Sequence, residues 1–377
     1  DNINGQRIIK AFSKEDEELD RFDTVSSDLY EADLKLNNSE ATLFPVLTIL
    51  LSMLAVVMLT FGGLMVANGE MTVGTLLNFT VYLTMLVGPL DFLSWVSNWW
   101  ARCVDSAQRV FEIVDAKPEI VEKEHPMEIG EVRGDIEISK LEFEYEPAQP
   151  VIKDLDLKVN AGQMLGIVGK TGAGKTTIAN LIARLYDPKA GCVKIDGVDV
   201  RDLPLDTIRK NVGLVSQDIY LFIGTIADNI RYAKPDATMD EIIAAAKAAS
   251  AHDFIMKMEK GYDTELKEHG AGLSIGQRQL IAFARTMISM PKILILDEAT
   301  SSIDTHTELL VQQGIEALLS GRTSFVIAHR LSTIQNADRI FVIDQGGILE
   351  QGSPAELMEK KGAYYKLYMA QFAGLQE

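Results

Sequence analysis

Eight consecutive residues predict chemistry most clearly: positions 169–176, which read GKTGAGKT. They fit the phosphate-binding pattern G-x-x-x-x-G-K-[ST], in which glycines let backbone N–H groups wrap the phosphates of a nucleotide. We expect Lys175 to reach the β- and γ-phosphates and the Thr176 hydroxyl to bind Mg²⁺. The apolar run Met164–Val168 and the helical run Ile178–Leu185 supply the strand and helix that this loop needs on either side. The residues predicted at the phosphates are Gly169, Gly172, Gly174, Lys175, Thr176 and Thr177.

An acidic pair forms the second candidate. The apolar run Ile293–Leu296 ends in Asp297 and Glu298. The carboxyl end of a central strand in an α/β protein lies in the crevice where ligands bind. We expect Asp297 to bind Mg²⁺, directly or through water, and Glu298 to polarise the attacking water. Two acids after an apolar run are a weak signal alone, but together with the phosphate loop they predict hydrolysis of a nucleoside triphosphate.

Charge and cysteine content exclude some partners. The formal net charge is -18, from 54 acidic and 36 basic residues. Such a surface repels the phosphate backbone, so we expect no nucleic-acid partner. The two cysteines, Cys103 and Cys192, have neither metal-binding spacing nor a disulfide framework, which fits a reducing cytoplasmic compartment.

The elements around these candidates begin with an apolar hairpin. The stretch Ala41–Gly69 contains no charged residue, and after Glu70 a second uncharged stretch covers Met71–Leu90. A membrane helix needs about 20 apolar residues, so we predict membrane helices at about 41–68 and 72–100. Basic residues flank the hairpin on both outer sides but are missing from its turn, which places both outer ends in the cytoplasm. These are Arg7, Lys10, Lys14, Arg21 and Lys35 before it, and Arg102 and Arg109 after it.

A charged stretch with Pro118, Pro126 and Gly130 follows the hairpin and is typical of a linker. Beyond it, short β-rich runs alternate with helical segments, which predicts an α/β domain with a largely parallel sheet. The expected strands are Asp135–Tyr145, Leu165–Val168, Val193–Ile195, Val212–Val215, Ile293–Leu296, Thr323–Ile327 and Arg339–Ile343.

Residues 273–279, LSIGQRQ, resemble the signature of the ATP-binding cassette (ABC) family, and the resemblance covers essentially the whole chain. The signature opens a helix expected at Gln277–Ser289, whose positive end can face a phosphate. In the family, this helix faces the ATP held by a second subunit. The resemblance therefore implies that Ser274, Gly276 and Gln277 act on the partner's nucleotide.

Four more residues match functional positions of the family. Gln217 resembles the glutamine that senses Mg²⁺ and connects to the membrane domain, and His329 resembles the switch histidine at the γ-phosphate. Asp304 resembles the loop that communicates between the two subunits. Tyr145 resembles the aromatic residue that stacks on adenine, an interaction of about 1–3 kcal/mol per base. Thr264–Gly270 resembles the segment that exporters place near their intracellular loops.

The membrane part shares the resemblance. Residues 4–12, NGQRIIKAF, look like the cytoplasmic start of the fifth helix of an exporter half-transporter, and residues 107–111, AQRVF, look like the end of its sixth. We therefore expect a piece of a longer protein, with four earlier helices outside it. The implied fold is a helical transmembrane hairpin (1–112), a linker (113–132) and an α/β P-loop ATPase domain of the ABC type with an inserted helical subdomain (133–377).

One residue departs from the family pattern. Ile275 stands where the signature usually has Gly, and a β-branched side chain there hinders close approach to a nucleotide. In some heterodimeric exporters, one subunit keeps the catalytic glutamate but carries an altered signature. The presence of Glu298 with Ile275 resembles that kind of subunit, so a heterodimer is favoured over a homodimer.

The predicted function is ATP-driven export of a hydrophobic or amphipathic substrate (a drug, lipid or peptide) across the cell membrane, with ATP and Mg²⁺ bound by a cytoplasmic domain. An importer built on the exporter fold, as for metal chelates, is the main alternative. A soluble ABC ATPase is less compatible with the apolar hairpin, and nothing in the sequence indicates the regulatory segment of an ATP-gated channel. The sequence does not identify the substrate.

Overall fold

The computed structural model describes residues 2–297, 305–328 and 331–373, and at 36–48 and 87–101 most side chains lie outside the described set. The chain divides into two compact units, Asp1–Lys117 and Pro118–Glu377. This division falls inside the predicted linker, 113–132.

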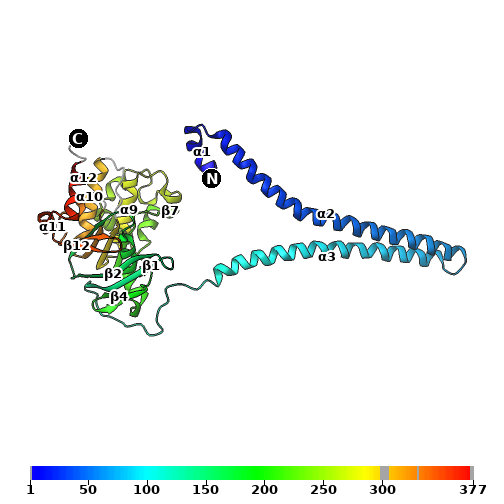
Figure 1. Cartoon of the computed structure of the whole chain (residues 1–377), viewed down its shortest axis with the longest axis horizontal. Helices are drawn as coiled ribbons and strands as arrows, with labels where there is room; N and C mark the ends of the chain where they lie inside the picture. Colours follow the sequence, from blue (N-terminus) through cyan, green and yellow to red (C-terminus); the bar gives the residue numbers. More distant parts are fainter. Residues whose placement is uncertain (1, 298–304, 329–330, 374–377) are drawn as a thin grey trace. The chain divides into compact units, whose positions relative to one another are not determined.

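The first unit is a helical hairpin preceded by a short helix, α1 (Asn2–Ala11). Helices α2 (Glu15–Ala67) and α3 (Val73–Val114) pack against each other over the part of their length next to the turn (Figure 1). Gly62 allows close approach there, because a Cβ atom on it would lie 2.4 Å from Leu76 Cδ1. The N-cap of α3 is Thr72, whose hydroxyl accepts a hydrogen bond from the Thr75 N–H at 3.2 Å.

Many apolar side chains of both long helices are exposed. Phe61 of α2 and Leu77 and Met85 of α3 each have more than half of their surface accessible. Within the described residues, neither helix contains a segment that meets the length and apolarity of a membrane crossing.

The second unit is built on a six-stranded sheet with the order β12-β11-β3-β10-β9-β6. Strands β11, β3, β10, β9 and β6 are parallel, and β12 pairs antiparallel with β11. The register sets Asp297 beside Ile327, and Leu296 beside Val215. The carboxyl ends of the parallel strands therefore meet at one edge of the sheet. The strands are β3 (Met164–Gly169), β6 (Val212–Val215), β9 (Ile293–Asp297), β10 (Thr323–Ile327), β11 (Arg339–Asp344) and β12 (Gly347–Gly352).

A second, antiparallel sheet has the order β2-β1-β4-β5 and corrects the predicted topology. The runs expected at Asp135–Tyr145 and Val193–Ile195 form β1 and β4 of this sheet and do not join the parallel one. Antiparallel pairing follows from the short connection between β1 and β2, because a parallel pair needs a long crossover. The strands are β1 (Ile136–Glu144), β2 (Pro150–Val159), β4 (Ala190–Ile195) and β5 (Val198–Asp199).

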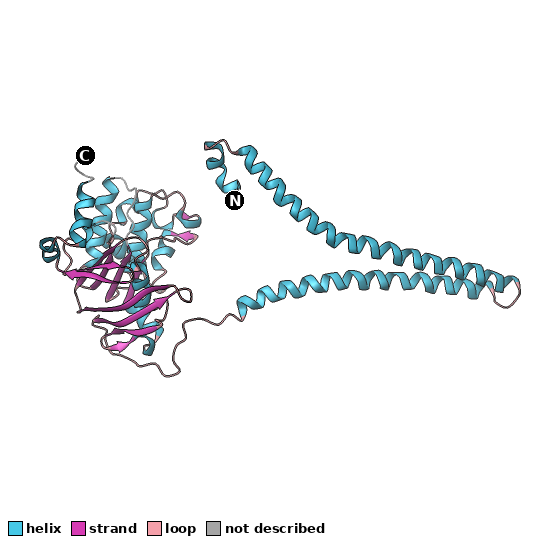
Figure 2. Ribbon diagram, viewed as in Figure 1, coloured by secondary structure: helices cyan, strands magenta, loops and turns pink. Residues whose placement is uncertain are grey.

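Alternating side chains of the parallel sheet build two cores. Leu294, Leu296 and Val326 pack with the helices on one face, whereas Ile295 and Phe325 pack with the antiparallel sheet and α4 on the other. The central strands are buried on both faces, as parallel sheets require. Figure 1 and Figure 2 show the strands of this unit in layers, with its helices α9, α10 and α12 on one side of them. The helices are α4 (Lys175–Ile182), α5 (Leu205–Asn211), α6 (Ile226–Arg231), α7 (Met239–Ala248), α8 (His252–Met256), α9 (Ile275–Met287), α10 (Thr305–Leu319), α11 (Pro354–Lys360) and α12 (Ala363–Ala373).

Helices α6 to α9 lie in sequence between β6 and β9, and their apolar faces share the helical core. The two-residue strands β7 (Gly224–Thr225) and β8 (Glu265–Leu266) pair within the same insertion. These elements form the helical subdomain that was predicted inside the α/β domain.

Candidate nucleotide site

The phosphate loop connects β3 to α4 at the carboxyl edge of the parallel sheet. Gly169 has a φ of 155°, and a Cβ atom on it would lie 2.1 Å from the Ile343 carbonyl oxygen. Gly174, the N-cap of α4, has a φ of 99°, and its Cβ would lie 2.7 Å from Ile152 Cδ1. Only glycine fits both positions, so the loop can turn tightly and present its N–H groups at the start of α4.

Lys175 is folded over this loop. Its ammonium donates to the carbonyl oxygens of Gly169 and Lys170, each at 2.9 Å. Burial lowers the pKa of Lys175 from its ordinary value, and the negative charge of Asp297 opposes that effect. Because the ammonium is only partly solvated and is bound by backbone carbonyls, it can exchange these carbonyl partners for phosphate oxygens.

Thr176 and Asp297 join the loop to the end of β9. The Thr176 hydroxyl donates to Asp297 Oδ2 at 2.7 Å, and Asp297 is only 4% exposed. Its other oxygen, Oδ1, is buried and has no hydrogen-bond partner among the described residues. Mg²⁺ prefers oxygen ligands and is usually held by one or two carboxylates together with substrate phosphates. The hydroxyl and the unpartnered carboxylate oxygen fit that ion.

Tyr145, directly after β1, forms an aromatic corner with two other rings. Its centroid lies 4.8 Å from that of Phe143 and 5.2 Å from that of Tyr186, both edge to face. Its hydroxyl donates to Thr177 Oγ1 at 3.2 Å, and about half of the residue is exposed. The corner thus connects the predicted adenine-stacking residue to the first turn of α4. Phe143 and Tyr186 were not predicted, although an aromatic residue just after the phosphate-loop helix was a visible signal.

Gln217 lies in the exposed loop after β6, the strand next to β9. Together with Ile275 and Arg278 of α9, it lines a cavity of about 460 Å³. The other residues around the cavity are Asp218, Ile219, Tyr220, His269 and Gln279.

The signature residues shape the start of α9, which begins at Ile275 and not at Gln277 as predicted. The reason is a capping box: Ser274 Oγ accepts from the Gln277 N–H at 3.2 Å, and Gln277 Oε1 accepts from the Ser274 N–H at 3.0 Å. Gly276 is buried, and Ile275 is 39% exposed. The signature residues therefore lie together at the N-terminus of α9. Their capping hydrogen bonds do not involve the phosphate loop.

Three predicted residues, Glu298, Asp304 and His329, lie outside the described residues. Glu298 follows Asp297 directly in sequence.

Similarity to known proteins agrees with this geometry. The family described as "ABC transporter" matches residues 152–301, and the family described as "ABC transporter transmembrane region" matches residues 1–90. The chain belongs to the ABC transporter family. The match to the first family contains the phosphate loop, the signature and Asp297, and the match to the second contains α1, α2 and the first part of α3.

Individual ABC transporters resemble the chain over nearly all of its length. An uncharacterized ABC transporter ATP-binding protein, YknV, of Bacillus subtilis (strain 168) is 40% identical over 99% of the chain, and an ATP-dependent lipid A-core flippase of Syntrophus aciditrophicus (strain SB) is 42% identical over 99%. The chain spans 62% of the length of each. A solved bacterial Atm1-family ABC exporter with ATP bound is 35% identical, with a TM-score of 0.84, covering 98% of this chain and 65% of that one.

Proposed function

We propose that this ABC transporter chain hydrolyses ATP in a Mg²⁺-dependent site and couples that hydrolysis to export of a hydrophobic or amphipathic substrate. The observation that carries the proposal is the convergence of Lys175, Thr176 and Asp297 at the carboxyl edge of the sheet. A buried cation, a hydroxyl and a carboxylate with one oxygen that has no partner among the described residues are the groups that a metal–triphosphate needs. Transporter relatives that match both units support the coupling to transport.

Each described residue has a defined task in this proposal. The loop N–H groups between Gly169 and Gly174 bind phosphate oxygens, and Lys175 neutralises charge on the β- and γ-phosphates. Thr176 and Asp297 hold Mg²⁺, which when bound stabilises negative charge on the transferred phosphoryl group. Tyr145 stacks on the adenine. Thr177 orients that ring through its hydroxyl and lies beside the phosphates in the first turn of α4.

The hydrolytic step needs residues beyond this set. Glu298 polarises the attacking water, His329 contacts the γ-phosphate, and Gln217 senses Mg²⁺ from the neighbouring strand end. Helix termini and charged side chains of this kind lower the barrier because they stabilise charge that develops in the transition state.

A second half-transporter subunit completes the two ATP sites. Ser274, Gly276 and Gln277 face the partner's ATP through the N-terminus of α9, and Asp304 communicates between the subunits. Ile275 supports a heterodimer, because its partly exposed β-branched side chain occupies a position where glycine permits close approach. The partner then supplies an unaltered signature to the ATP bound by Lys175 here.

The proposed location is the cell membrane, with residues 1–112 in or next to the bilayer, 113–132 as the linker and 133–377 as a cytoplasmic ATPase domain. Exposed apolar side chains along α2 and α3 support contact with lipid or other membrane helices. Relatives named for lipid A-core and fatty acid support an amphipathic substrate. The importer alternative predicts the opposite transport direction in vesicles.

Glu298→Gln in the full-length protein with its partner tests the hydrolytic part. We expect Mg²⁺-ATP binding to be kept while phosphate release falls at least about 100-fold, because the attacking water loses its polarising group. Near-normal hydrolysis would exclude Glu298 as the essential residue. Glu316→Gln, in α10, is a matched control that should hydrolyse at the wild-type rate.

A further inference from the structure

The segment that leaves the helical hairpin is fastened to the ATPase domain. We call residues 118–132 the strap. Its Met127 N–H donates to the Asp202 carbonyl at 2.6 Å, and Lys123 forms an ion pair with the Asp202 carboxylate. Near its end, Glu131 pairs with Lys292 at 2.9 Å and Val132 is buried. The strap has no regular secondary structure, yet several of its groups are bound to the domain.

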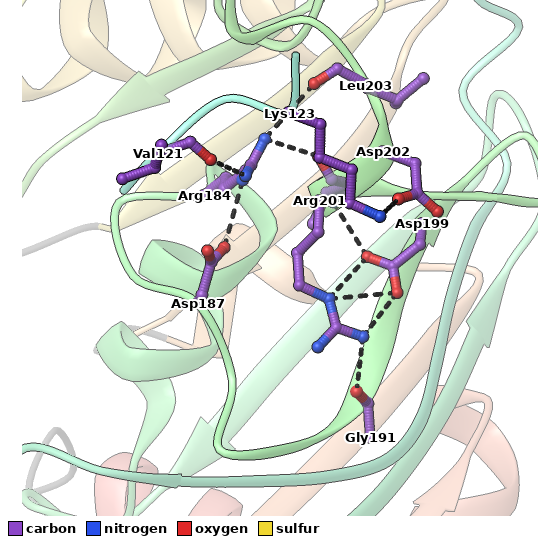
Figure 3. Close-up of polar contacts among 10 residues, drawn as sticks. Val121, Lys123, Arg184, Asp187, Gly191, Asp199, Arg201, Asp202 and Leu203 are labelled. Atoms are coloured by element: carbon purple, nitrogen blue, oxygen red, sulfur yellow. Dashed lines mark hydrogen bonds and ion pairs between the residues drawn. The ribbon is translucent and has the colours of Figure 1, made fainter. Parts of the chain in front are cut away.

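The deepest of these contacts is made by Arg184. This residue follows the C-cap of α4, Ala183, and its side chain is 1% exposed. One terminal nitrogen donates to the Val121 carbonyl of the strap at 3.2 Å, and Nε donates to Asp187 Oδ1 at 3.1 Å. The other terminal nitrogen donates to the carbonyls of Val200 and Leu203 at 3.0 and 3.3 Å. Figure 3 shows this guanidinium between the strap and the segment around Asp202.

The backbone conformation and the side-chain chemistry of Arg184 both indicate that these contacts stabilise the local structure. Its φ is 49°, a left-handed conformation that costs a non-glycine residue about 1–2 kcal/mol. Only a guanidinium offers five donors in a rigid fork, whereas lysine offers one compact ammonium. Removing the fork leaves buried carbonyls without partners, so the local structure holds Arg184 in place and depends on it.

We propose that Arg184 is a positioning residue that fastens the strap to the phosphate-binding helix, so that ATP-driven movement of α4 reaches the hairpin. This inference rests on the proposed transport function. Helix α4 carries Lys175 and Thr176 in its first turn, and Arg184 follows its end about 12 Å away. One short, rigid helix thus joins the phosphates to the strap.

The chain between the end of α3 and the Arg184 contact is short, so the contact leaves little slack between the hairpin and the strap. Val121 is seven positions after Val114, the last residue of α3 (121 − 114 = 7). Without the Arg184 contact, the next backbone anchor is Met127, thirteen positions after Val114 (127 − 114 = 13). The six added residues provide up to about 20 Å of slack. Such slack lets α4 move without moving the hairpin.

The test uses the full-length protein with its partner in lipid vesicles and compares Arg184→Lys with wild type. Three readouts are taken: the rate of trypsin cleavage after Lys123, the affinity for Mg²⁺-ATP, and the number of ATP molecules hydrolysed per substrate moved. We expect cleavage about tenfold faster, an ATP affinity within about twofold of wild type, and several-fold more ATP per transport event. Arg201→Lys is the matched control, because Arg201 bonds to Asp199 and the Gly191 carbonyl and to no strap residue.

Unchanged cleavage and unchanged coupling in Arg184→Lys would overturn the inference. If that variant does not fold, Asp187→Asn decides by the same readouts, since it removes the carboxylate that orients the guanidinium. If wild type itself moves no substrate, the transport proposal fails. The cleavage rate and ATP affinity then still report whether Arg184 fastens the strap.

Discussion

Thr176 and Asp297 are far apart in sequence, yet the Thr176 hydroxyl donates to the Asp297 carboxylate at 2.7 Å. This bond joins the first turn of α4 to the end of β9, next to the ammonium of Lys175. Asp297 Oδ1 stays buried and unpartnered among the described residues. The pair therefore forms a small oxygen-lined site, and a cation is the ligand that best fits its unpartnered oxygen.

Thr176→Val tests the metal-binding role of the hydroxyl. The substitution nearly keeps side-chain size but removes one oxygen ligand, so Mg²⁺ should bind about 10–100-fold more weakly and hydrolysis should fall accordingly. The measurement is ATP hydrolysis as a function of Mg²⁺ concentration. Thr286→Val is the control, because the Thr286 hydroxyl donates only within α9, to the Ala282 carbonyl. An unchanged Mg²⁺ dependence in Thr176→Val would remove this residue from the site.

The pKa of Lys175 predicts how ATP affinity depends on pH. Burial lowers this pKa below 10.5 in the free site, and bound phosphates favour the charged ammonium and raise it again. Binding therefore takes up a proton at alkaline pH. Affinity should be full below the lowered pKa and should fall by up to about tenfold per pH unit as the pH rises through it.

Nucleotide affinity measured from pH 7 to pH 10 checks this expectation. Lys175→Arg is the control, since arginine stays protonated over this range and any binding it keeps should be less pH-dependent. Equal pH profiles for the two proteins would show that Lys175 does not titrate at the phosphates.

The aromatic corner predicts graded effects on ATP affinity. Tyr145→Ala should weaken binding by about 10–100-fold, because a stacked base contributes about 1–3 kcal/mol. Tyr145→Phe keeps the ring and loses only the bond to Thr177, so its loss should be small. Tyr186→Ala should fall between them, since it removes an edge-to-face contact that orients Tyr145. Titration with a fluorescent ATP analogue gives this order, and equal affinities for wild type and Tyr145→Ala would contradict stacking.

Gly169→Ala should destabilise the ATPase domain by at least about 3 kcal/mol. The added methyl group meets the Ile343 carbonyl oxygen at 2.1 Å, so β3 and β11 must separate where the phosphate loop begins. Thermal unfolding of the purified protein measures the loss. Gly130→Ala is the matched control, because a Cβ atom there has nothing within 4 Å and its melting temperature should not change.

The identity of the partner is tested through the signature. Expressed alone, the full-length subunit should hydrolyse ATP slowly, and Ile275→Gly should raise that rate because it restores glycine at the helix terminus. Adding the true partner should raise the rate of the unaltered subunit much more. Full activity of the unaltered subunit alone would favour a homodimer.

Local motifs were the most predictable part of the site. The phosphate loop was located from sequence because its eight consecutive residues carry the whole pattern, and Asp297 because it ends a fully apolar strand. Strand β2 was missed since Asp156 and Lys158 alternate with its buried positions and two further charged residues, Lys153 and Asp154, precede them. An edge strand with one solvent-facing side resembles a polar loop when only its composition is considered.

Contacts between distant segments were the least predictable part. Arg184 lies inside the run expected to be helical, Ile178–Leu185, and the sequence did not indicate its acceptors, which lie up to 63 residues away. The structural role of Tyr186 was likewise not predictable, because it depends on ring contacts with Phe143 and Tyr145, which the antiparallel sheet brings close to it. Tertiary packing decides such partners, and a single sequence carries no direct record of it.

Phosphate release from ATP by the full-length protein and its partner in lipid vesicles, with wild type compared to Lys175→Ala, tests the central claim most directly. Wild type should hydrolyse ATP only with Mg²⁺ and move substrate in proportion, whereas Lys175→Ala should lose at least about 100-fold of both while remaining in the vesicles. Hydrolysis and transport at the wild-type rate by Lys175→Ala would contradict the account.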